Sequence, residues 1–125
     1  MYMLTDHINS TVPGTNYQIG AMHAMDIRLK FDNMAAGEAN RPAGVPPTLT
    51  PTPLTPEEQA DHAMAARNMS RMWANFARTS QPSAQGQPEW PAYELQRRAT
   101  MMISAHCHVA DDPYPAEREV WTEIG

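Results

Sequence analysis

Residues 55–77 carry the signals that most constrain the fold of this chain. Thr55 is a suitable N-cap, Pro56 takes the first helical position, and Glu58 completes a Thr-x-x-Glu capping box. Together they predict a helix from about Pro56 to Ala77. An apolar stripe at helical spacing follows the cap and consists of Ala65, Met69, Met72, Trp73 and Phe76. Because such a stripe needs a partner surface, we expect the helix to pack on other elements.

The rest of the chain predicts short strands and one further helix. Tyr2–Thr5 has the pattern of a short strand, and residues 9–16 are a run of turn-forming types. Residues 100–103 and 107–109 predict a β-hairpin, and residues 116–124 predict a terminal helix. A lone N-terminal strand must pair its backbone with strands outside this sequence or with another copy of the chain.

Two further segments lack regular periodicity. Residues 17–34 predict a loop and a short helical turn, in which Ile27, Leu29 and Phe31 are expected to face inward. Residues 35–53 are rich in Pro, Gly and Thr and predict a linker or surface loop. The expected organisation is a terminal strand with a histidine loop in 1–34, a Pro-rich loop or linker in 35–54, and one partial domain in 55–125.

Composition excludes several classes of partner. The 125 residues suffice for one modest domain, and a net charge of −5 without a basic cluster argues against nucleic acid or an anionic membrane as partner. A single cysteine, Cys107, excludes an intrachain disulfide. No signal-peptide pattern and no apolar run of about 18 residues occur in the sequence. These features do not separate a cytoplasmic from an exported protein.

Three short motifs occur in order along the chain: Gly-Ala-Met-His-Ala-Met-Asp-Ile at 20–27, Trp-Ala-Asn-Phe-Ala-Arg-Thr at 73–79, and Trp-Pro-Ala-Tyr at 90–93. In this order they resemble the C-terminal quarter of type-B carboxylesterases, the cholinesterase-like branch of the α/β-hydrolases. The resemblance implies a mostly parallel sheet with helices on both sides, of which this chain would supply the final strand and flanking elements. Its own fold is then expected to be mainly α, with a short β-hairpin and an N-terminal strand, and incomplete on its own.

The resemblance also implies roles for three residues. His23 falls where the family carries its catalytic base, which takes the proton of the nucleophilic serine and later returns it to the leaving group. Gly20 and Asp26 are expected to support the histidine loop, Asp26 as a brace and not as the acid of the triad. No cofactor and no metal are implied, and the substrate of the full enzyme is a carboxylic ester.

The chain departs from the family pattern in places. The family often has glycine where this chain has Ala24, and Gly-Asp-Pro-Asn is typical where Ser80-Gln81-Pro82-Ser83 stands. No Gly-x-Ser-x-Gly elbow and no glycine-rich oxyanion loop occur in the sequence, and in this family the nucleophile and the acid precede the histidine in chain order. The chain alone is therefore expected to be inactive or nearly so, with the remainder of the esterase or another copy of itself as its partner.

Other interpretations remain open. The chain could be a non-enzymatic helical module that binds a partner or itself through its apolar stripe. On a strand, His106 and His108 would share one face and could bind a metal with Asp111 or Asp112, although two exposed histidines are the simpler interpretation. Asp6 and His7, near a turn, are interpreted as a solvent-exposed pair.

Overall fold

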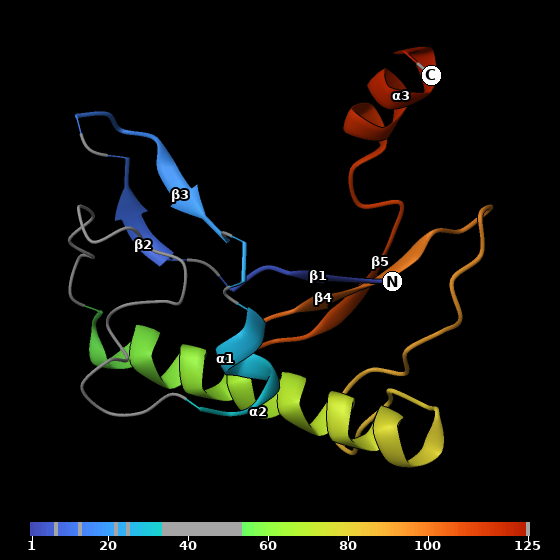
Figure 1. Ribbon diagram of the computed structural model, residues 1–125, viewed down its shortest axis with the longest axis horizontal. Coiled ribbons are helices and arrows are strands. Elements are labelled where there is room, and N and C mark those ends of the chain that lie inside the picture. Colours follow the sequence, from blue (N-terminus) through green and yellow to red (C-terminus); the bar gives the residue numbers. More distant parts are fainter. Residues whose placement is uncertain (7, 13, 22, 25, 34–53, 125) are drawn as a thin grey trace.

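The computed structural model describes residues 1–6, 8–12, 14–21, 23–24, 26–33 and 54–124. Apart from residue 54, the segment predicted as a Pro-rich loop at 35–54 lies outside these residues. In chain order the elements are β1 (Tyr2–Leu4), β2 (Ile8–Thr11), β3 (Gln18–Gly20), α1 (Asp26–Lys30), α2 (Pro56–Thr79), β4 (Ala99–Ile103), β5 (His108–Asp111) and α3 (Pro115–Ile124). Figure 1 shows a small sheet beside the long helix α2.

The central sheet joins the two ends of the sequence. Its strand order is β1-β4-β5, with β1 parallel to β4 and β4 antiparallel to β5. Tyr2 lies opposite Met101, and Leu4 lies opposite Ile103. The expectation that the N-terminal strand finds no partner within this chain is therefore wrong, as is the expectation that the chain supplies only a final strand of the sheet. Within the described residues, no strand pairs with the other edge of β1.

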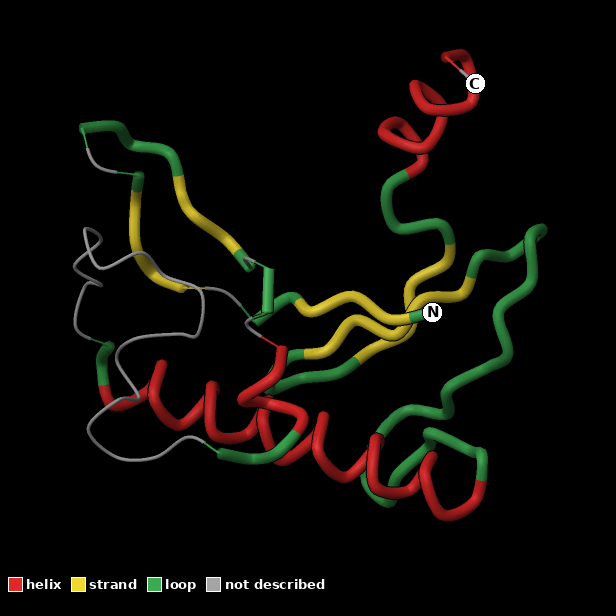
Figure 2. Tube along the Cα trace, in the orientation of Figure 1, coloured by secondary structure: helices red, strands yellow, loops and turns green. Residues whose placement is uncertain are grey.

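A second hairpin, β2–β3, was not predicted. Ile8 lies opposite Gly20 and Thr11 lies opposite Gln18, and the connecting turn is closed by a hydrogen bond from Val12 N to Tyr17 O at 2.9 Å. Figure 2 shows this hairpin extending away from the three-stranded sheet. Its sequences, Ile-Asn-Ser-Thr and Gln-Ile-Gly, lack the apolar alternation that identifies a strand. The prediction of a mainly α chain with one hairpin was therefore incomplete.

Helix α2 forms as its cap predicts, and it ends two residues beyond the predicted Ala77. The Thr55 hydroxyl accepts from Glu58 N at 3.2 Å, and the Glu58 carboxylate accepts from Thr55 N at 2.7 Å. At the other end Ser80 has φ 60° and donates its backbone N–H to Phe76 O at 2.8 Å. This left-handed conformation is one that glycine adopts without strain and that is less favourable for serine.

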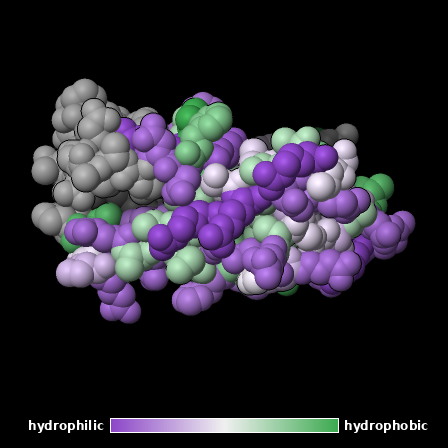
Figure 3. Space-filling model, turned by 90° about the horizontal axis from the view of Figure 1, so that it is seen from below, coloured by the Kyte–Doolittle hydropathy of each residue, from purple (hydrophilic) through white to green (hydrophobic). Residues whose placement is uncertain are grey.

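The core lies between α2 and the sheet, as the apolar stripe predicts. Its fully buried members come from both elements: Ala65, Ala66, Met69 and Met72 from α2, with Met101 and Ile103 from β4. Seen from below, the outer surface of α2 is mostly hydrophilic (Figure 3). The stripe is uncovered toward its C-terminal end, where Trp73 is half-buried and Phe76 is exposed.

The two remaining helices bury little. Of the three side chains expected to face inward near α1, Leu29 is buried, whereas Ile27 and Phe31 are exposed. Because α1 has only five residues, it presents a single apolar side chain to the core. Helix α3 has no buried residue and stands apart from the sheet in Figure 1. None of the described helices is long and apolar enough to cross a membrane.

Candidate functional site

His23 lies in the short loop between β3 and α1, and it is exposed. Two residues of this segment have left-handed backbone: Gly20 with φ 69° and Ala24 with φ 66°. A Cβ added to Gly20 would meet no atom within 4 Å, so glycine is needed there for backbone conformation and not for space. For a residue with a Cβ the left-handed conformation costs about 1–2 kcal/mol. Ala24 therefore adopts, under strain, a conformation that glycine would adopt freely.

A cavity of about 340 Å³ separates the histidine loop from β1. All three residues of β1 line it, together with Ala21, His23 and Ala24 of the loop and Asp26 at the start of α1. Among the described residues, no carboxylate forms a hydrogen bond or ion pair with the imidazole of His23. His23 thus borders a cavity next to the open edge of the sheet.

Asp26, the first residue of α1, connects that helix to β1. Its carboxylate accepts a hydrogen bond from the Tyr2 hydroxyl at 3.0 Å and lies 2.6 Å from the Lys30 ammonium. The hydrogen bond from Lys30, helped by the one from Tyr2, holds the pKa of Asp26 below its ordinary value. Burial and the nearby Asp26 raise the pKa of Tyr2. One oxygen of this carboxylate thus joins α1 to Tyr2 of β1 and to Lys30 of the same helix.

Tyr2 contacts one residue from each of the three sequence motifs. Besides its hydrogen bond to Asp26, its ring meets the ring of Trp73 edge-on, with the centroids 4.8 Å apart, and lies 6.4 Å from that of Trp90. Lys30 Nζ lies 5.7 Å from the centre of the Trp73 ring. Motifs separated by up to 70 residues in the sequence thus meet around the first residue of β1.

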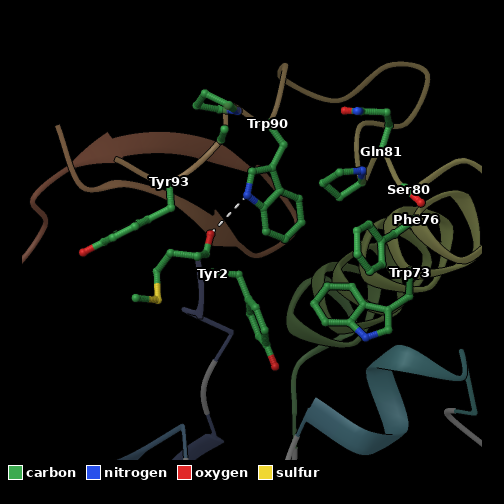
Figure 4. Close-up of a pocket in the computed structure, with 11 residues that line it drawn as sticks. Tyr2, Trp73, Phe76, Ser80, Gln81, Trp90 and Tyr93 are labelled. Atoms are coloured by element: carbon green, nitrogen blue, oxygen red, sulfur yellow. Dashed lines mark hydrogen bonds between the residues drawn. The ribbon is translucent and has the colours of Figure 1, made fainter. Parts of the chain in front are cut away.

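A second cavity, of about 450 Å³, is lined mainly by aromatic side chains, among them Tyr2, Trp73 and Trp90. Figure 4 shows the rings of Tyr2, Trp73, Phe76, Trp90 and Tyr93 around it, with a hydrogen bond of 3.1 Å from Trp90 Nε1 to Met1 O. Among its described lining residues there is no histidine, carboxylate or amine side chain. The chemistry of this cavity suits the binding of an apolar group and not proton transfer.

Sequence reasoning missed two polar clusters on α2. Asp6, interpreted as solvent-exposed, is only 9% exposed and pairs with His62, whereas His7 lies outside the described residues. Asn68, which is 2% exposed, donates to Ser104 O and Ala105 O, both at 3.1 Å, and accepts from Gln87 Nε2 at 2.9 Å. On α2, His62 lies three residues before the buried Ala65, and Asn68 lies three residues after Ala65 and four before the buried Met72. A polar residue on a buried stripe needs a partner, and that signal could have identified them.

The alternative metal site lacks the geometry it requires. His106 lies in the turn after β4 and His108 begins β5, so the two do not alternate along one strand, and both are exposed. Within the part of the chain that the structure describes, no group of three His, Cys, Asp or Glu side chains could hold a metal ion.

Comparison with known proteins finds similarity to carboxylesterases. The model of the Carboxylesterase family matches residues 1–121. Carboxylesterase 5A of Felis catus is 52% identical over 61 residues, which are 49% of this chain and 11% of the cat protein. Carboxylesterase 1E of Mus musculus is 37% identical over 59 residues, 47% of this chain and 10% of the mouse protein. The matched segment is thus about a tenth of the length of these relatives.

Solved structures agree on the fold. The carboxylesterase of Geobacillus stearothermophilus superimposes with a TM-score of 0.56 at 30% identity, over 96% of this chain and 21% of that enzyme. A thermophilic PNB esterase gives a TM-score of 0.64 at 22% identity, over 95% of this chain and 21% of its own length, and this likeness concerns the fold alone. The elements described here correspond to about a fifth of an esterase α/β-hydrolase fold. With the family match over residues 1–121, the chain belongs to the carboxylesterase family.

Proposed function

We propose that this chain is the C-terminal part of a serine carboxylesterase, which hydrolyses carboxylic esters by acyl transfer, and that His23 is its general base and general acid. The observation that carries the proposal is the position of His23 within the family match, in a loop that borders a cavity beside the edge strand β1. The small share of the relatives' length that the chain covers supports the view that the other catalytic groups lie elsewhere.

The imidazole of His23 would take the proton of a serine hydroxyl as the serine attacks the ester carbonyl. It would then give this proton to the departing alcohol, while a carboxylate on its other ring nitrogen fixes the tautomer. His23 is exposed and has no described carboxylate partner, which supports a role in which both nitrogens find their partners in the remainder of the enzyme. The serine, the acid and the oxyanion donors would all come from that remainder.

Gly20 and Asp26 serve as positioning residues in this proposal. The left-handed backbone of Gly20 ends β3 and directs the chain into the histidine loop. On the other side of the loop, Asp26 fastens the start of α1 to Tyr2 of β1. These contacts support a loop that is held at both ends, as a catalytic histidine requires.

The open edge of β1 is the surface through which the remainder of the enzyme would join. Unpaired backbone groups along a strand need hydrogen-bond partners, and a strand added at this edge would lie next to the cavity that His23 borders. A second copy of this chain is the alternative occupant, and it would make the chain a self-association module. The exposed Phe76 and Tyr93 at the aromatic cavity favour this second candidate.

The isolated chain is expected to show no saturable hydrolysis of p-nitrophenyl acetate. Without a nucleophilic serine and oxyanion donors, each of which contributes on the order of 100-fold or more, only slow release by free imidazole should remain. The assay compares the wild type with His23→Ala and with His108→Ala, which removes another exposed histidine. Saturable turnover that an organophosphate inhibits and that His23→Ala alone abolishes would contradict the proposal.

A further inference from the structure

Asp6 and His62 form a shielded hydrogen-bonded pair between two distant segments of the chain. His62 Nδ1 lies 2.5 Å from Asp6 Oδ2, and the two side chains are 15% and 10% exposed. Asp6 follows β1 and is the last described residue before β2, whereas His62 lies in the second turn of α2. The pair therefore fastens the segment that leads into the β2–β3 hairpin to the long helix.

The backbone around Asp6 is attached to the sheet just before the hairpin begins. Thr5 N, Thr5 Oγ1 and Asp6 N all donate to Ile103 O, at 2.9, 3.1 and 3.3 Å, so the chain is attached to the sheet up to this point. Beyond it, β2 and β3 make their extensive contacts with each other, among the described elements. In Figure 1 the hairpin projects from the body of the molecule. Its orientation then depends on how its two ends are held.

The charges that surround His62 favour its protonated form. A cavity of about 340 Å³ next to the pair brings together Asp6 from the segment after β1, Glu58 and Asp61 from α2, and His106 from the turn between β4 and β5. Among the residues that the structure describes, no lysine or arginine lines it. The hydrogen bond with Asp6, and then the charges of Asp6, Glu58 and Asp61, raise the pKa of His62 above its ordinary value, although burial opposes them.

We infer that Asp6 and His62 form a pH-dependent latch, which holds the start of the β2–β3 hairpin on α2 while the imidazole is protonated and loosens when the proton is lost. Deprotonation removes the positive charge of the imidazole and leaves at most a neutral hydrogen bond between His62 and Asp6. Because the folded state raises the pKa of His62, the stabilisation is complete below about pH 6.5 and disappears as the pH rises through the folded-state pKa. The inference does not depend on esterase activity.

Nuclear magnetic resonance titration of the imidazoles in the 125-residue chain tests the latch. The His62 signal, assigned by its absence in His62→Gln, should titrate above the range of an unperturbed histidine. Asp6→Asn should shift its midpoint downward, whereas His106→Gln, at an exposed position on the same cavity, should change it much less. A wild-type His62 that titrates at or below the ordinary histidine value would overturn the inference.

The response of the hairpin supplies a second readout. The backbone amides of Thr11 and Gln18, in the two hairpin strands, should change their chemical shifts with the midpoint of His62. This change should persist in His23→Gln, which removes the imidazole at the other end of the hairpin, and should vanish in His62→Gln. If the chemical shifts of these amides depend on pH in the same way in the wild type and in His62→Gln, protonation of His62 does not affect the hairpin, and the inference is wrong. Should His62→Gln fail to fold, the His62 signal is assigned instead by its proximity to other protons of α2, and the hairpin amides of Asp6→Asn are compared with those of the wild type.

Discussion

Replacement of Met101 by alanine is expected to destabilise the folded chain by about 2–5 kcal/mol, the range for a fully buried methionine that leaves a cavity. Met101 has no exposed surface, and it belongs to the cluster that joins β4 to Met69 and Met72 of α2. It also lies in the central strand, opposite Tyr2 on one side and Val109 on the other. A domain of this size has a total stability of only about 5–15 kcal/mol, so the loss should be large in urea denaturation followed by tryptophan fluorescence.

Met64→Ala is the matched control for this prediction. Met64 is a methionine of α2 that is 43% exposed, so its truncation should cost much less, about 0.5 kcal/mol. Equal losses for the two variants would mean that β4 does not pack on α2 as described here.

Asn68→Leu is expected to cost about 2–4 kcal/mol, because it removes all the hydrogen bonds of a buried amide at once. Leucine would leave the carbonyls of Ser104 and Ala105 without their donor, and the Gln87 side chain without its acceptor. These partners belong to two loops, so the turn between β4 and β5 and the segment after α2 should both loosen. Denaturation measures the free energy, and hydrogen exchange at residues 104–107 reports the local effect.

The matched control is Arg67→Leu. It introduces leucine at the position before Asn68 on α2, where the native residue is exposed. It should change the free energy of unfolding by no more than about 0.5 kcal/mol. If Asn68→Leu were equally harmless, the hydrogen bonds of Asn68 would not be what holds the two loops on the helix.

The parts of the fold that the sequence predicted correctly are those with local signals. Helix α2 begins where its capping box indicates, because the two reciprocal hydrogen bonds join residues only three apart. Its end was placed too early, since Ser80 adopts a left-handed cap that the sequence does not mark with glycine. The pairing of β1 with β4 spans almost the whole chain, and no local pattern reports a contact of that range.

The residues of the candidate site also fall into two groups: those that a local motif identifies and those whose contacts join distant parts of the chain. His23, Gly20 and Asp26 were identified through a motif of eight consecutive residues, and their roles stay predictions. The contacts of Asp26 with Tyr2 and of Asp6 with His62 join residues 24 and 56 apart, so periodicity could not reveal them. Ile27 and Phe31 were wrongly expected to face inward, because apolar character alone does not tell which side of a five-residue helix is buried.

The most direct test of the account is the intact mass of the source protein after reaction with a fluorophosphonate, which labels activated serines. We expect the adduct in a polypeptide longer than 125 residues that contains this sequence, on a serine outside it, and we expect His23→Ala to abolish the labelling. An adduct on a serine within this sequence (Ser10, Ser70, Ser80, Ser83 or Ser104), or a labelled protein of 13.9 kDa plus the label, would contradict the account.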